Sequence, residues 1–230
     1  MKRTLQTLIL LSTALLAGAS QAAAPQAFTV EVTGQGRPLI LIPGLASSGE
    51  VWQGTVERLC GPQAGRACHV LTLAGFAGMA PIKGDLMAQA EQQLADYIVA
   101  QKLGQPAIIG HSLGGFLALK MAIDHPAQTG KLLIVDSLPA LGAVQMPNAT
   151  PEQLQAMSSQ MQSAMRAQDV ASSSASQRRT VAGMATAPAD VERIIGWGQR
   201  SDRETVIRAM GTLMASDLRQ DVARIASPTL

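Results

Sequence analysis

The stretch AIIGHSLGGF, residues 107–116, places a serine between glycines at the end of an apolar run. Its first residues predict a buried strand, and the residues after the serine predict a helix over about 113–124. A sharp turn between a strand and a helix lifts a serine hydroxyl out of the packed interior, where a substrate carbonyl can reach it. Ser112 is therefore a candidate nucleophile; a small residue in a glycine-rich packing turn is the other interpretation.

Strand-like runs alternate with helical patterns along residues 28–136, the predicted core. The runs are FTVEV, LILI, HVLTL and KLLIVD (Phe28–Val32, Leu39–Ile42, His69–Leu73 and Lys131–Asp136). This alternation predicts an α/β fold with a mostly parallel sheet and helices on both faces. Ligands of such sheets bind beyond the carboxyl ends of the strands, which is where the PGLAS loop, Ser112 and Asp136 fall.

Residues 137–216 show a different pattern, without strand-like runs, and are interpreted as a helical cap or lid. Residues 217–230 are interpreted as a return to the core. Three methionines at four-residue spacing either line an adaptable acyl-chain pocket or pack one helix onto another: Met157, Met161 and Met165. The stretch ASSSASQ, residues 171–177, is predicted to be a mobile loop.

The composition is that of one globular domain with a sizeable core. The chain has 230 residues, of which 47% are hydrophobic, 15% charged and 3% aromatic, with a net charge of +2. We find no basic cluster with interleaved aromatic residues, so nothing indicates nucleic acid or an anionic membrane as a partner.

The first 22 residues have the layout of a secretory signal peptide. Lys2 and Arg3 precede an apolar run through Ala17, and small residues lead to a predicted cleavage site after Ala22. The apolar run is too short to span a membrane comfortably, so a stable membrane anchor is the less favoured interpretation. The protein is therefore expected to be exported, either to the periplasm or out of the cell.

Two cysteines agree with export, because disulfides persist in oxidising compartments. Cys60 and Cys68 flank GPQAGRA, a loop whose glycines and proline can bring its ends together. A disulfide is expected, and two free buried thiols are the alternative. The cysteines have no companion metal ligands, so no metal site is predicted.

Three segments together carry a resemblance to a known family. GHSLGG, between a predicted strand and helix, resembles the nucleophile elbow of the α/β-hydrolase family, in its lid-bearing esterase and lipase branch. LILIPGLASSGEVW is similar to that family's oxyanion loop, with Pro43-Gly44 in place of the usual His-Gly. HPAQTGKLLIVDSLPAL resembles the segment joining the elbow helix to the next strand. The resemblance covers most of the chain after residue 28.

The resemblance implies a carboxylesterase-like serine hydrolase that acts on a small-molecule acyl substrate without a cofactor or metal. Ser112 would be the nucleophile, and the backbone N–H groups of Leu45 and Leu113 would form the oxyanion hole. Gly110 and Gly114 would leave room for the tight turn. An ester, lactone, amide or thioester substrate all remain open.

The histidines depart from the family's order, in which an acid and then a histidine follow the cap. The sequence holds only His69, His111 and His125. His69 is expected to begin its strand at the end opposite the site, and His125 lies about 20 Å along the elbow helix. His111 adjoins Ser112, but consecutive residues on such a turn point in different directions. All three histidines are therefore interpreted as structural.

The last residues, DLRQDVARIASPTL, predict a helix, a Ser-Pro break and the first residues of a strand. We expect the 230 residues to be a truncated form of a longer hydrolase, with the last strand or strands, acid and histidine missing. Asp136 is a second candidate acid. The alternative function is a non-catalytic pseudo-hydrolase that binds a small apolar ligand, and a relic without a stable fold is a third. A dehalogenase would require Asp in place of Ser112.

Overall fold

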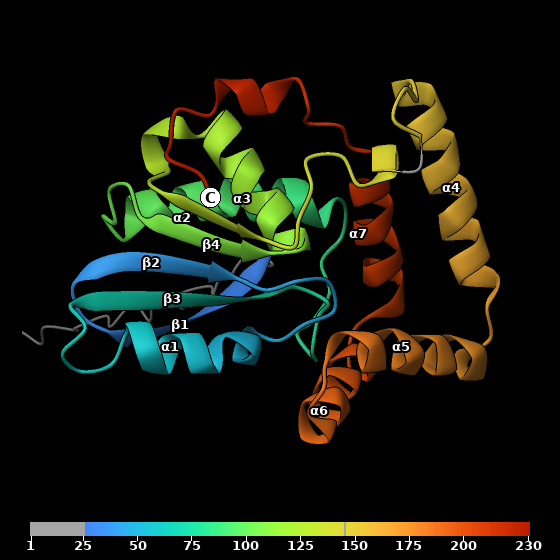
Figure 1. The fold of residues 1–230 in the computed structure, drawn as a ribbon, viewed down its shortest axis with the longest axis horizontal. Coiled ribbons are helices and arrows are strands. Elements are labelled where there is room, and N and C mark those ends of the chain that lie inside the picture. Colours follow the sequence, from blue (N-terminus) through green and yellow to red (C-terminus); the bar gives the residue numbers. More distant parts are fainter. Residues whose placement is uncertain (1–25, 145) are drawn as a thin grey trace, which may run out of the picture.

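The computed structural model describes residues 26–144 and 146–230, so the predicted signal peptide lies outside the described residues. These residues form a five-stranded sheet with the order β1-β3-β2-β4-β5 (Figure 1). Strand β1 pairs antiparallel with β3, and the other neighbours are parallel. The predicted mostly parallel sheet is therefore confirmed. Its strands are β1 (Phe28–Gly34), β2 (Arg37–Ile42), β3 (Arg66–Leu73), β4 (Ala107–His111) and β5 (Leu132–Val135).

Helices cover both faces of the sheet (Figure 1). One apolar cluster joins Ile40 of β2 to α2 (Leu86–Ala100) and α3 (Leu113–Asp124). The other cluster joins Leu41 of β2 to the segment around α1 (Gln53–Leu59). Successive residues of a strand point to opposite faces, so a strand that is covered on both sides is apolar throughout. This is why LILI reads as a continuous apolar run.

Strand β3 begins three residues earlier than the sequence indicates. The expected strand starts at His69, whereas the observed one starts at Arg66. His69 therefore lies inside the strand, opposite Val32 of β1 and Ile40 of β2, and not at its beginning. The earlier start follows from pairing with two neighbouring strands, a long-range effect that the polar and small residues Arg66 and Ala67 do not reveal.

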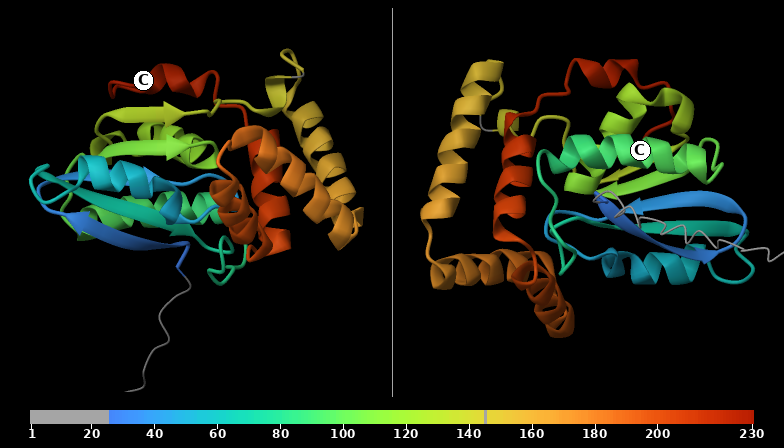
Figure 2. Two further views of the ribbon diagram at one scale, coloured as in Figure 1. Left: turned by 60° about the horizontal axis from the view of Figure 1, so that its bottom comes forward. Right: turned by 180° about the vertical axis from the view of Figure 1, so that it is seen from behind.

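A helical segment follows the sheet, and it consists of α4 (Pro151–Ala167), α5 (Val170–Met184), α6 (Pro188–Gln199) and α7 (Arg203–Ala215). Figures 1 and 2 show α7 beside the carboxyl ends of the parallel strands and α4 on its far side. Within the part of the chain that the structure describes, no helix has both the length and the apolar character needed to cross a membrane.

The expectation of a mobile loop over residues 171–177 is wrong, because these residues belong to helix α5. Asp169 caps this helix by accepting a hydrogen bond from the backbone N–H of Ser172, at 2.9 Å. Serine has only a weak preference against the helical conformation. A capped start is therefore enough to carry the serine-rich stretch into the helix.

Polar contacts hold α4 on α7. Ser158 Oγ donates to the carbonyl oxygen of Gly211 at 2.8 Å, and Arg166 pairs with Glu204 at 2.7 Å. The two helices approach closely, since a Cβ on Gly211 would stand 2.2 Å from Nε2 of Gln162. The methionines of α4 are half-buried on this packed helix.

The residues after α7 return to the sheet through a short 3₁₀ helix, η4 (Asp221–Arg224). The other short 3₁₀ helices of the described residues are η1 (Gly49–Trp52), η2 (Pro126–Gln128) and η3 (Gly142–Val144). Leu132 N donates to Pro228 O at 2.9 Å, and Ile134 N donates to Leu230 O at 2.8 Å. Residues 228–230 thus run parallel to β5, as expected for the start of a strand after the Ser-Pro break.

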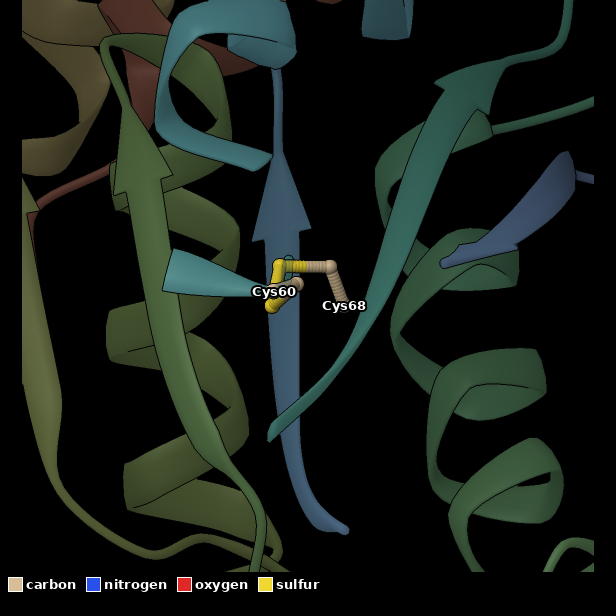
Figure 3. Close-up of a disulfide and its surroundings, with 2 residues drawn as sticks. All are labelled: Cys60 and Cys68. Carbon is tan, nitrogen blue, oxygen red and sulfur yellow. A yellow bond between two sulfur atoms is a disulfide. The ribbon is translucent and has the colours of Figure 1, made fainter. Parts of the chain in front are cut away.

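A disulfide joins Cys60, at the end of α1, to Cys68 in β3 (Figure 3). The two Cα atoms are 5.8 Å apart, and both side chains are buried within the α1 face of the core. The bond therefore ties this helix to the sheet.

Reduction of this disulfide is expected to lower the free energy of unfolding by about 2–3 kcal/mol, because the bond restricts a short loop of the unfolded chain. Urea unfolding with and without dithiothreitol measures the change. The double variant Cys60→Ala, Cys68→Ala is the control, and its midpoint should not respond to the reductant. An equal midpoint for oxidised and reduced wild-type protein would contradict this expectation.

Candidate active site

Ser112 stands at the corner between β4 and α3 in a conformation that serine rarely adopts. Its φ is 52° and its ψ is −117°. Such a backbone costs about 1–3 kcal/mol and persists only where the surroundings fix it. Here Ser112 N donates to Val135 O at 2.9 Å, and Ser112 O accepts from Phe116 N at 3.0 Å. The side chain does not cap α3 and is half-buried, so its hydroxyl is free for another role.

The two elbow glycines are required because backbone passes within contact distance of both. A Cβ on Gly110 would stand 2.2 Å from the carbonyl oxygen of Gly114. A Cβ on Gly114 would stand 2.3 Å from the carbonyl oxygen of Ile42, the last residue of β2. The first turn of α3 therefore packs directly on the end of β2, which brings the serine beside the loop that follows this strand.

That loop contains Leu45, one of the two predicted oxyanion donors. A Cβ on Gly44 would stand 3.4 Å from Cβ of Ser112, so the loop lies against the serine. The N–H group of Leu113, the other predicted donor, is the first of α3 and has no acceptor within the helix. Ala46, directly after Leu45, has a φ of 55°, in the left-handed region. The sequence does not indicate this conformation.

His111 lies closer to the oxyanion loop than sequence reasoning indicates. Its Nδ1 atom would be 2.9 Å from a Cβ on Gly44. This nitrogen is buried and makes no hydrogen bond to any described residue. Burial lowers the pKa of His111 because it penalises the charged imidazolium, and the carboxylate of Asp136 partly opposes this effect. Burial therefore favours the neutral form of the ring.

The other two histidines are engaged away from Ser112. His69 Nδ1 lies 2.7 Å from the Tyr97 hydroxyl, between β3 and α2. His125 follows the end of α3, and its Nε2 is 3.7 Å from a carboxylate oxygen of Glu91. His111 is thus the one histidine of the sequence that adjoins the serine.

Asp136 follows β5 directly and is exposed, with a φ of 47°. Val135, just before it, pairs with His111 across β4 and β5. Ser137, just after it, packs on the elbow helix, because its Cβ is 2.6 Å from where a Cβ on Gly115 would stand. The structure therefore places this carboxylate, like the serine corner, at the carboxyl ends of the parallel strands.

The described residues thus bring together the strained Ser112, the N-terminus of α3 and the Gly44 loop at the carboxyl ends of the parallel strands. Backbone N–H groups in such an arrangement can stabilise an oxyanion that forms at the serine. Among residues 26–144 and 146–230, no three His, Cys, Asp or Glu side chains are grouped so that they could hold a metal ion.

Comparisons with known proteins bear on this arrangement. Residues 39–229 match a family described as "Alpha/beta hydrolase family". One similar protein is RutD of Yersinia enterocolitica, which is provisionally named as a carbamate hydrolase. It is 28% identical over 211 residues, which cover 87% of this chain and 72% of RutD. A pimeloyl-[acyl-carrier protein] methyl ester esterase of Vibrio atlanticus is 34% identical over 116 residues, or 50% of this chain and 42% of the esterase.

Solved structures share the fold. A thermophilic esterase from Thermogutta terrifontis superposes with a TM-score of 0.70 at 20% identity, covering 88% of this chain and 72% of the esterase. The matched segment thus spans less than half the length of the Vibrio esterase and about three quarters of the Thermogutta enzyme.

Proposed function

The chain belongs to the alpha/beta hydrolase family, and from that premise we propose that it is an exported serine hydrolase that cleaves an ester-like acyl substrate through Ser112. The resemblance carried by the elbow and the oxyanion loop is confirmed at the level of the family. Hydrolase and esterase relatives support a hydrolytic activity. The observation that carries the serine mechanism is the strained backbone of Ser112, held against the Gly44 loop.

The proposed reaction has two steps. Ser112 Oγ attacks the carbonyl carbon, its proton leaves to a base, and the negative oxygen that forms accepts hydrogen bonds from the N–H groups of Leu45 and Leu113. The leaving alcohol takes up a proton as the acyl bond breaks, and water then releases the acid from the acyl-enzyme. Each oxyanion donor is worth about 3–4 kcal/mol in the transition state.

A second candidate function is a non-catalytic relative that binds a small apolar ligand. It is favoured by one observation: within the described residues, His69 and His125 are engaged elsewhere and no hydrogen bond joins the Ser112 hydroxyl to an imidazole. Without a base, a serine hydroxyl is a weak nucleophile. This candidate predicts saturable ligand binding without turnover.

Export is the second part of the proposal. It rests on the signal-like residues 1–22 and on the buried Cys60–Cys68 disulfide, since disulfides are rare in reducing compartments. Both observations favour the periplasm or the exterior of the cell.

One labelling experiment tests both parts. Protein from the periplasmic or secreted fraction of its source cells is treated with a fluorophosphonate, and its intact mass and labelled peptide are recorded. Ser112 Oγ should displace fluoride and form one phosphonate ester. The mature chain should begin at Ala23, and its mass also reports where it ends.

The controls are serine variants of the full chain. Ser112→Ala should remain unlabelled, whereas Ser163→Ala, which removes an exposed hydroxyl of α4, should label like the wild type. Absence of a Ser112 adduct in wild-type protein would refute the hydrolase. Recovery of the protein only from the cytoplasmic fraction would refute export, and retention of residues 1–22 would refute the predicted cleavage. Neither result would bear on the hydrolase.

A further inference from the structure

A cavity of about 350 Å³ lies between the start of α2 and the facing sides of α4 and α7. Its volume is at the small end of the range for small-molecule sites. Ser112, Leu45 and Leu113 do not line it, so it is separate from the candidate active site. Its polar side chains include Asp85 of α2, Gln155 and Ser158 of α4, and Thr205, Arg208 and Thr212 of α7.

Arg208 is the cation of this cavity, and its hydrogen-bonding groups are poorly satisfied. Its Nε atom is buried and makes no hydrogen bond to any described residue. Its Nη2 atom has only two long contacts, at 3.5 Å to Ile82 O and 3.4 Å to Thr205 Oγ1. No ion pair of Arg208 is found among the described residues. Two carboxylates, Asp202 and Glu204, lie near enough to be influenced by its charge, and Glu204 pairs with Arg166.

The Oδ1 atom of Asp202 is bound to the start of α7 and makes no hydrogen bond to Arg208. It accepts from Thr205 N at 2.8 Å and from Thr205 Oγ1 at 2.6 Å, and thereby caps α7. A guanidinium offers five N–H donors in a fixed plane, a geometry that matches a carboxylate. Burying donors of a charged group without partners is costly. The cavity is therefore suited to a ligand that brings an anion to Arg208.

Asp85, an exposed residue that also lines the cavity, limits what else the ligand can carry. Its Oδ1 atom caps α2 by accepting from Met87 N at 2.8 Å and from Ala88 N at 3.2 Å. A carboxylate at this position repels a second negative charge but accepts a hydrogen bond from a hydroxyl. Leu86 and Ala209 add apolar surface for a short carbon chain.

We propose that this cavity binds a small hydroxycarboxylate, whose carboxylate pairs with Arg208 and whose hydroxyl donates to Asp85. This binding is independent of the chemistry at Ser112.

Isothermal titration calorimetry of the full chain with lactate, 3-hydroxybutyrate and gluconate tests the proposal. At least one of these probes should bind, and Arg208→Gln should weaken it about tenfold or more, because a charge-assisted pair becomes a neutral one. The matched control is Arg179→Gln, which removes the same charge from an exposed position of α5 and should bind like the wild type. Ser112→Ala should also leave the affinity unchanged.

A second variant excludes a general loss of structure. Asp85→Asn keeps a good helix cap but removes the negative charge, so it should tighten the binding of butyrate, which carries no hydroxyl. A damaged cavity would weaken every ligand. The proposal is overturned if none of the three probes binds, if Arg208→Gln binds like Arg179→Gln, or if Asp85→Asn does not tighten butyrate. Loss of binding in Ser112→Ala would assign the ligand to the serine site instead.

Discussion

Ser112→Ala is expected to lower the turnover of p-nitrophenyl acetate by about 10³-fold or more. Removal of the nucleophile eliminates the acyl-enzyme route, and only binding and the oxyanion donors remain to assist water. The elbow backbone should be unchanged, because alanine at this position has the same hydrogen-bonded neighbours as serine. Steady-state rates of wild type and variant, measured at equal folded concentration, give the ratio.

Ser112→Gly separates strain from chemistry. It should lose the same activity, yet its free energy of unfolding should rise by about 1 kcal/mol, because glycine adopts a φ of 52° without a steric cost. Equal turnover by wild type and Ser112→Ala would contradict the serine mechanism. Wild-type protein that binds a ligand saturably without turnover would favour the pseudo-hydrolase.

Gly114→Ala is expected to lower the free energy of unfolding by about 3 kcal/mol, as overpacking of a close contact does. Helix propensity alone predicts the opposite sign, because alanine favours a helix more than glycine does. The added Cβ would stand 2.3 Å from Ile42 O and 2.6 Å from Pro43 O. Both are backbone atoms at the end of β2, so the contact cannot be relieved by a side-chain rotation. Urea unfolding measures the change.

Gly54→Ala is the matched control. Gly54 lies near the start of α1, is exposed, and would have no neighbour within 4 Å of an added Cβ. Its substitution should leave stability unchanged or raise it by about 0.5 kcal/mol, in line with helix propensity. Similar effects of the two substitutions would show that the contact between α3 and β2 does not set the requirement for glycine.

Much of the site could be anticipated because its signals are local. The corner at Ser112 is encoded by an apolar run, two glycines and a helical pattern within ten residues, and the structure has that strand, turn and helix. The disulfide could be anticipated for the same reason, since Cys60 and Cys68 are separated by eight positions. Short-range constraints of this kind act on the chain before distant segments meet.

Two of the differences arise from contacts between distant segments, and the third arises from a local helix cap. The start of β3 at Arg66 depends on pairing with β1 and β2, and the helical state of residues 171–177 depends on the Asp169 cap. The position of the His111 ring against Gly44 requires β2 and β4 to be neighbours. No residue pattern near Arg66 or His111 indicates these two contacts, whereas Asp169 is a local N-cap signal for the helix over residues 171–177.

The amino-acid sequence by itself determined the alternation of strands and helices, the serine corner and the pairing of the cysteines, because periodicity, glycine and short loops act within a few residues. Only the tertiary structure decided that Gly114 must pack on the backbone of β2, and that Arg208 of α7 and Asp85, just before α2, line the same cavity. Residues 85 and 208 come to line one cavity only when the helices assemble around the sheet, so this shared surface is a property of packing and not of local sequence.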